Sequence, residues 1–221
     1  KVLIKKYDVL KDRISVQYLA PKKAFHYEYL DEEKIAATLK KYNLPAKKYL
    51  LYFDKNGTQN TLSNVLTALT KINEETAEAW AVLQIGTVQK NAGSSILYTV
   101  DYIEESDLNL FYNYAQGLLH LTENTGRGLT VLESLNCGTP VLYYQKSMLE
   151  NLVGKAGLPI DTADVLNIKN QIKKLLLEES HRSENPTNAQ VQANKFSWLK
   201  TAFQTIQVYE KTAAHENRDH S

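Results

Sequence analysis

The chain has 221 residues, which is enough for one large domain with a substantial hydrophobic core. It carries 26 basic and 25 acidic residues, and the resulting net charge of +1 gives no electrostatic reason to expect a nucleic acid or an acidic membrane surface as partner. The single cysteine, Cys137, excludes an internal disulfide framework and favours a reducing compartment, so we expect a cytoplasmic protein.

No run of residues reaches the roughly 18 apolar positions that a transmembrane helix requires, so we expect no transmembrane segment. No secretory signal peptide is visible, and the chain begins with Lys1 rather than methionine. We therefore expect the sequence to be truncated at its start.

The first 29 residues are predicted to contain one strand, over residues 14–19, after a charged lead-in and before a basic and aromatic loop. Asp31 is the expected N-cap of a helix that ends near Tyr42, just before the break LPAKK. The many charges of this helix indicate a solvated face.

Short apolar runs alternate with helical patterns through the middle of the chain. The runs predicted as strands cover residues 49–53, 80–85, 96–100, 117–121 and 141–144. Helices are predicted over residues 62–72, from Glu105 or Ser106 onward, and over residues 129–136. The run YLLYF at 49–53 is continuously apolar, which is typical of a buried parallel strand. The loop that follows such a strand lies where α/β sheets bind ligands.

The most specific pattern is TENTGRGLTVLESLNCGTPVLYY, over residues 122–144. Gly126 and Gly128 let the backbone approach a ligand closely, and a helix beginning at Leu129 would direct its free N–H groups and positive dipole end at that ligand. A phosphate is the expected occupant. Glu133 lies one helical turn further, where its carboxylate could accept hydrogen bonds from sugar hydroxyls.

A plainer interpretation stays open for these residues. Glycines before a helix are common turn chemistry in α/β proteins, and a glutamate on a helix is usually just solvated. Cys137 is interpreted as a small packed residue, because the sequence places no histidine near it to support a nucleophile.

The C-terminal third is predicted to be helical with one interruption. A helix with its apolar stripe inward is expected over residues 163–179, followed by a polar break at 181–188. Residues 194–211 predict an amphipathic helix pair in which Trp198 and Phe203 pack. The last residues, 213–221, are expected to form a frayed, disordered polar tail.

The string TGRGLTVLESLNCGTPVL resembles the donor-site signature EGFGLPVLEAMACGTPVI of retaining, GT-B-type glycosyltransferases of group 1 (family 4). The resemblance implies that Glu133 binds the ribose of a nucleotide-diphosphate sugar and that the backbone from Gly126 to Leu129 binds its diphosphate. It departs at Thr125, where the family carries the glutamate that contacts the donor sugar. Further departures fall on the loop after the first strand of the sheet.

That loop has the form "vGRL...KG" in the family, and its Arg and Lys neutralise the diphosphate. The alignment places Lys55 at the arginine position and Asn60 at the lysine position, so one charge is kept and one is lost. Arg127 is a possible auxiliary anion contact. Tyr102 and Ile103 fall where the family lays the nucleotide base, although each fits equally well as a core residue, and Lys55 as an ordinary loop lysine.

The resemblance extends from about Ile14 to Lys211 and implies an α/β fold: a Rossmann-like three-layer sandwich with a parallel sheet, one half of a GT-B fold. We expect residues 1–29 to be an interdomain linker with its strand, residues 30–212 to be the nucleotide-sugar-binding domain, and residues 213–221 to be the tail. The family's last helix reaches back to the first domain, so an exposed apolar face is expected near the C-terminus.

The function implied is donor binding for a retaining hexosyltransferase, with no metal or cofactor beyond the nucleotide-diphosphate sugar. The acceptor would be held by a missing N-terminal domain or partner subunit, so the isolated chain is expected to be inactive. The alternative, motivated by Thr125 and Asn60, is a degenerate domain that acts as a binding or scaffolding subunit. An ordinary dinucleotide-binding domain ranks low, because no Gly-x-Gly-x-x-Gly follows the first strand of the sheet.

Overall fold

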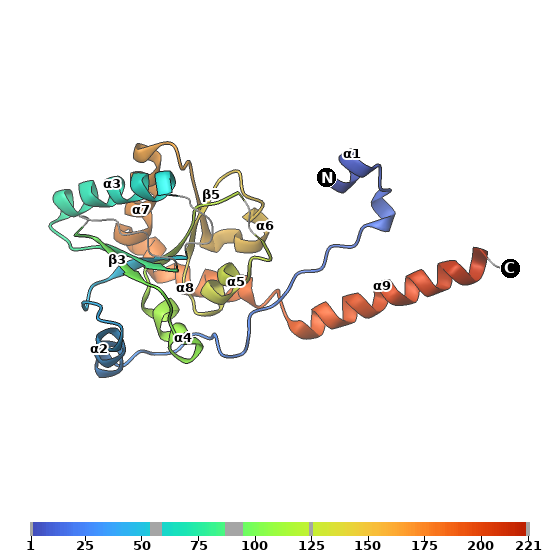
Figure 1. Cartoon of the computed structure of the whole chain (residues 1–221), viewed down its shortest axis with the longest axis horizontal. Coiled ribbons are helices and arrows are strands. Elements are labelled where there is room, and N and C mark those ends of the chain that lie inside the picture. Colours follow the sequence, from blue (N-terminus) through green and yellow to red (C-terminus); the bar gives the residue numbers. More distant parts are fainter. Residues whose placement is uncertain (1, 54–58, 87–94, 124–125, 220–221) are drawn as a thin grey trace. The chain divides into compact units, whose positions relative to one another are not determined.

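The computed structural model describes residues 2–53, 59–86, 95–123 and 126–219 (Figure 1). The chain divides into two compact units. The larger unit is Pro21–Lys195, and the smaller unit consists of Lys1–Ala20 and Phe196–Ser221.

Among the described residues, the larger unit is built on a six-stranded parallel sheet in the order β3-β2-β1-β4-β5-β6. The strands are β1 (Tyr49–Phe53), β2 (Ala81–Ile85), β3 (Leu97–Val100), β4 (Gly117–His120), β5 (Val141–Tyr144) and β6 (Gly157–Ile160). Five of them confirm the predicted strands. The sixth, β6, was not predicted, because its sequence GLPI is short and contains a proline, which a sheet tolerates at its edge.

Helices cover both faces of this sheet and complete the predicted three-layer α/β fold (Figure 1). On one face α3 (Gln59–Thr76) packs beside α7 (Val165–Leu177), over a core that includes Leu50, Tyr52 and Leu119. On the other face lie α4 (Glu105–Tyr114) and α5 (Leu129–Asn136). Next to them, α2 (Glu32–Lys41) packs against α4, and α8 (Glu179–Ala193) packs against α5.

Helix α2 begins at the N-cap that the sequence predicts. The Asp31 side chain accepts a hydrogen bond from the backbone N–H of Glu33 and caps α2.

Between β5 and β6 the chain forms α6 (Glu150–Val153) and the 3₁₀ turn η2 (Gly154–Ala156). None of the helices in the described ranges combines the length and the apolar character needed to cross a lipid bilayer.

The strand predicted over residues 14–19 is wrong. Those residues are irregular and follow the short helix α1 (Val2–Tyr7) and the 3₁₀ turn η1 (Lys11–Arg13). A strand needs a neighbouring strand to satisfy its backbone, and within the smaller unit the carbonyl of Tyr18 instead accepts a hydrogen bond from the Thr201 hydroxyl, at 2.7 Å. Val16 is 66% exposed, so no core holds this segment in a sheet.

The polar break predicted over residues 181–188 is also wrong, because α8 runs through it with Pro186 inside the helix. Tertiary contacts explain the difference. Gln192 donates hydrogen bonds to the carbonyls of Asn151 and Leu152, both at 2.9 Å, and Ala189 is fully buried. Packing of the second half of α8 therefore outweighs the poor helix propensity of its first half.

The C-terminal segment is a single helix, α9 (Trp198–Asp219), rather than a helix pair with a frayed tail. Alanine, glutamate and arginine in its last two turns favour helix, which is why it continues beyond Lys211. Trp198 is 50% exposed and Phe203 is 61% exposed, so neither side chain is buried in a core. The expected exposed apolar face near the C-terminus is confirmed.

Candidate functional site

The order of the strands locates the candidate site. From β1 the sheet grows towards β3 in one direction and from β4 towards β6 in the other, so the chain reverses between β1 and β4. In open parallel sheets the loops that leave two such strands diverge, and a ligand crevice opens at their carboxyl ends. The loop after β4 contains Gly126 and Gly128 and leads directly into α5.

The two glycines adopt the left-handed conformation that side chains disfavour. Gly126 has φ of +53° and Gly128 has φ of +65°, and Gly128 is the N-cap of α5. A Cβ on Gly128 would lie 2.6 Å from Leu152 Cδ2, whereas no described atom lies within 4 Å of a Cβ built on Gly126. The loop is therefore tightly packed where it enters the helix and open at its first glycine.

The start of α5 is suited to an anion. Its first intrahelical hydrogen bond runs from Leu132 N–H to the carbonyl of Gly128, at 3.0 Å. The N–H groups of the three helical residues before Leu132 thus have no carbonyl partner within the helix. They form the positive end of the helix dipole, which lies beside the open loop. Arg127 is exposed there and forms no ion pair with any described residue, so its guanidinium can turn towards a ligand.

Glu133 is half-buried on α5, one turn beyond the loop. The hydroxyl of Tyr112, a fully buried residue of α4, donates a hydrogen bond to Glu133 Oε2 at 2.9 Å. Burial raises the pKa of Tyr112 well above its ordinary value, and the nearby Glu133 carboxylate raises it further. Tyr112 therefore stays a protonated donor, and the carboxylate is held in one place.

The segment over residues 21–28 forms hydrogen bonds to both helices of this site. The side chain of Asn136 on α5 donates a hydrogen bond to the carbonyl of Phe25. On α4, Asn109 Oδ1 accepts one from the backbone N–H of His26, at 2.9 Å. The segment thus ties the end of α5 to α4 and fixes the spacing of the two helices that carry Glu133 and Tyr112.

Cys137 is a packed residue, as expected. It is 1% exposed, and its thiol donates to Asn109 Oδ1 at 3.2 Å. Burial raises the pKa of the thiol well above its ordinary value, and the Glu133 carboxylate adds to that effect. A thiol held neutral in this way is a poor nucleophile.

The two residues predicted to hold the base lie in the loop from β3 to α4, which leaves the same edge of the sheet. The Tyr102 side chain is 70% exposed, so its interpretation as a core residue is wrong. Ile103 is buried, and its side chain belongs to the core. Lys41 holds the adjoining end of α4 in place through ion pairs to Glu104 and Asp107, at 2.8 and 2.7 Å.

Some predicted site residues lie outside what the structure describes. Lys55 and Thr125 fall outside the described residues, as does the side chain of Asn60. The structure instead adds Tyr112, Phe53 and Phe25, which no motif pointed to. Within the described ranges no cluster of three or more His, Cys, Asp or Glu residues is arranged to hold a metal ion.

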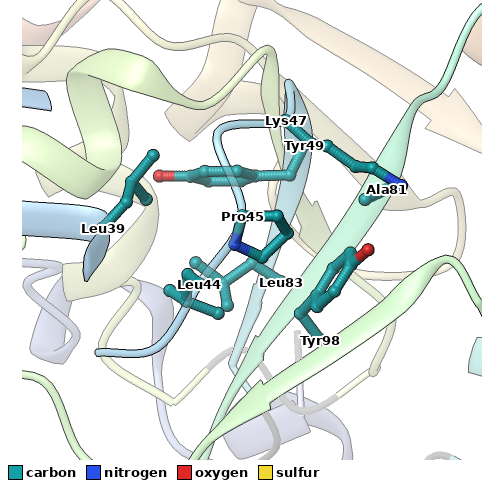
Figure 2. A pocket seen from close by; sticks show the side chains of 8 residues that line it. All are labelled: Leu39, Leu44, Pro45, Lys47, Tyr49, Ala81, Leu83 and Tyr98. Atoms are coloured by element: carbon teal, nitrogen blue, oxygen red, sulfur yellow. The ribbon is translucent and has the colours of Figure 1, made fainter. Parts of the chain in front are cut away.

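A separate apolar hollow lies against the amino-terminal half of the sheet (Figure 2). Its lining comes from the end of α2, the segment before β1, and the three strands β1, β2 and β3: Leu39, Leu44, Pro45, Lys47, Tyr49, Ala81, Leu83 and Tyr98. The Lys47 ammonium lies 5.7 Å from the centre of the Tyr98 ring. Tyr49 and Ala81 are the first residues of their strands, so this hollow is distinct from the crevice at the carboxyl ends.

Comparisons with known proteins identify the family of this chain. The family model described as glycosyl transferases group 1 matches residues 34–192. O-antigen chain mannosyltransferase B from Escherichia coli is 28% identical over 182 residues, which are 77% of this chain and 48% of that protein. The chain therefore spans about half the length of this curated relative, and less of others that it matches.

Solved structures share the fold. A glycosyltransferase from Rickettsia africae matches 95% of this chain and 60% of its own, with a TM-score of 0.78 and 14% identity. The C-terminal domain of a group 1 family glycosyl transferase from Francisella tularensis matches 78% of this chain and 95% of its own, with a TM-score of 0.61 and 13% identity. At these identities the likeness shows the fold alone, and it confirms the predicted Rossmann-like α/β architecture.

Proposed function

Because this chain belongs to the group 1 glycosyltransferase family, we propose that it is the nucleotide-sugar donor-binding domain of a retaining glycosyltransferase. The observation that carries the proposal is the left-handed Gly126 and Gly128 before α5, at the point where the sheet reverses, with Glu133 one turn beyond. This geometry combines a diphosphate cradle with a carboxylate for a ribose.

Each part of the site has a role in this proposal. The N–H groups at the start of α5 accommodate the diphosphate, and Arg127 and Lys55 supply positive charge as the leaving phosphate develops negative charge. The Glu133 carboxylate accepts hydrogen bonds from the ribose hydroxyls. The loop that carries Tyr102 and Ile103 holds the base. With protein charge stabilising the diphosphate, we expect binding that needs no metal ion.

The sugar acceptor belongs to another part of the enzyme in this proposal. Two observations support it: the chain spans about half of its mannosyltransferase relative, and it resembles nearly all of a structure described as a C-terminal domain. The mannosyltransferase relative favours a hexose as the transferred group. We therefore expect the isolated chain to bind a nucleotide-diphosphate sugar without transferring its sugar.

A second candidate is a degenerate domain that binds a protein partner instead of a donor. Asn60 and Thr125 favour it, since both replace charged residues of the family's pattern. Loss of one charge-assisted contact costs about 1.5 to 3 kcal/mol, or roughly ten- to a hundred-fold in affinity. Two such losses could silence the site.

Calorimetric titration with UDP, GDP and ADP and their hexose conjugates, repeated with EDTA, tests the proposal. We expect one base to bind at micromolar to sub-millimolar concentration, with Glu133→Ala reducing the affinity by about ten-fold or more. Glu74→Ala is the matched control, because Glu74 is exposed at the far end of α3. If the folded chain binds no nucleotide at millimolar concentration, the donor site is refuted and the degenerate subunit is favoured.

A further inference from the structure

Tyr112 occupies a position that the family motif does not mark. It lies in the last turn of α4, is fully buried, and places its hydroxyl 2.9 Å from Glu133 Oε2. A buried hydroxyl can be satisfied by any backbone carbonyl nearby. Here the partner is instead the one carboxylate to which the proposed function gives the ribose.

The Tyr112 ring has little freedom to move. The ring of Phe25 meets it edge-on with centroids 5.5 Å apart, and the ring of Phe53, at the end of β1, lies tilted against it at 5.7 Å. At the other end of the residue, Thr139 donates a hydrogen bond to the Tyr112 carbonyl at 2.6 Å. Ring and backbone are thus both clamped.

Three other parts of the chain therefore hold Tyr112. The segment 21–28 and the end of β1 pack against its ring, and the turn after α5 donates a hydrogen bond to its backbone carbonyl. Of these, the end of β1 lies at the carboxyl edge of the sheet, beside the point between β1 and β4 where the crevice opens. A group that the fold braces so fully is suited to hold another group still.

Only the neutral phenol can donate to a carboxylate. Burial and the neighbouring Glu133 both raise the pKa of Tyr112 well above its ordinary value. The phenol therefore keeps its proton at neutral pH and remains able to donate to the carboxylate.

We propose that Tyr112 is a positioning residue that fixes the carboxylate of Glu133 in the orientation that accepts the ribose hydroxyls. This inference rests on the proposed donor site. A glutamate side chain has several rotatable bonds, and binding is weakened when the ligand itself must order them. The hydrogen bond from Tyr112 orders them during folding, so the carboxylate meets the ribose already in place.

A purely structural role predicts something different. If Tyr112 only satisfies its own buried hydroxyl, removing that oxygen lowers stability without changing how ribose hydroxyls are recognised. Tyr49 provides the matched control. It is 4% exposed and its ring packs against Phe111 of α4, the helix that carries Tyr112. Its hydroxyl donates to the carbonyl of Phe111 at 3.0 Å rather than to Glu133.

The experiment measures recognition of the ribose hydroxyls directly. The full chain and the variants Tyr112→Phe and Tyr49→Phe are titrated with UDP, GDP and ADP and with the 2′,3′-dideoxy analogue of each. We expect Tyr112→Phe to reduce the preference for the ribonucleotide over its analogue by about three- to ten-fold. Affinity for the analogue should stay unchanged, and Tyr49→Phe should keep the preference of the parent chain.

A double-variant comparison and thermal melting complete the test. In a Glu133→Gln background, adding Tyr112→Phe should change the preference little, because the two residues act as one unit. Melting curves establish that each variant is folded. An unchanged preference in Tyr112→Phe, or an equal loss for ribonucleotide and analogue, overturns this inference alone. If the parent chain binds no nucleotide, the proposed function fails and the inference fails with it.

Discussion

The two glycines of the loop before α5 should respond differently to the same substitution. Gly126→Ala and Gly128→Ala each force alanine into the left-handed region, which costs about 1 to 2 kcal/mol. The surroundings separate them. A Cβ on Gly128 would lie 2.6 Å from Leu152 Cδ2, while none of the described atoms comes within 4 Å of a Cβ on Gly126.

The extra cost at Gly128 follows from the packing of Leu152. That side chain is 6% exposed, so it can escape the new methyl group only by disturbing its own neighbours. Overpacking of this kind typically adds about 1 to 3 kcal/mol. We therefore expect Gly128→Ala to lose about 2 to 5 kcal/mol and Gly126→Ala about 1 to 2 kcal/mol of unfolding free energy.

Urea denaturation followed by circular dichroism at 222 nm measures both losses, with unchanged slopes as the check that the denatured state is the same. In nucleotide titration we expect Gly126→Ala to lose more affinity than Gly128→Ala, which is the reverse of their order in stability. The reason is that a methyl group on Gly126 projects to the open side of the loop. Equal losses of stability for the two variants would refute the argument from Leu152. A larger loss for Gly126→Ala would show that the loop is not open there.

Three further variants test the electrostatics and the packing. Hydrogen bonding from Lys41, and secondarily from the Tyr42 hydroxyl, holds the pKa of Asp107 below its ordinary value, although burial opposes this. Above about pH 5, Asp107→Asn should therefore cause a small decrease in the urea midpoint. The difference from the parent chain should disappear as the pH falls below about 4 and through the folded pKa of Asp107. A difference that persists in acid would contradict this. Ile172→Ala, on the buried face of α7, should cost about 2 to 5 kcal/mol, whereas Phe203→Ala on α9 should stay within about 0.5 kcal/mol in chemical denaturation. Comparable losses would mean that the apolar face of α9 is covered.

Local patterns in the sequence were sufficient to predict most of the sheet. Residues 49–53 form β1 as expected, because a run that is apolar at every position is stable only where both faces are buried. The same holds for the loop before α5. Glycine is the residue that accepts positive φ without strain, so Gly126 and Gly128 marked the turn directly.

Helix boundaries in the C-terminal third depended on contacts that the local sequence does not contain. The string HRSENPTN is polar and includes Pro186, yet α8 continues through it because Gln192 and Ala189 are anchored against other elements. Conversely, the strand predicted over residues 14–19 found no partner strand. In α8, tertiary packing outweighs poor helix propensity. In residues 14–19, no strand forms because no neighbouring strand satisfies its backbone hydrogen bonds.

The sequence by itself determined the candidate cradle, because Gly126, Gly128 and Glu133 lie within one loop and the first turns of one helix. Only the tertiary structure decided what surrounds Glu133. Phe53 and Tyr112 are separated from it by many residues, and the parallel crossovers of the sheet bring β1, α4 and α5 together. A hydrogen bond between residues 21 positions apart depends on that topology, because no local spacing encodes it.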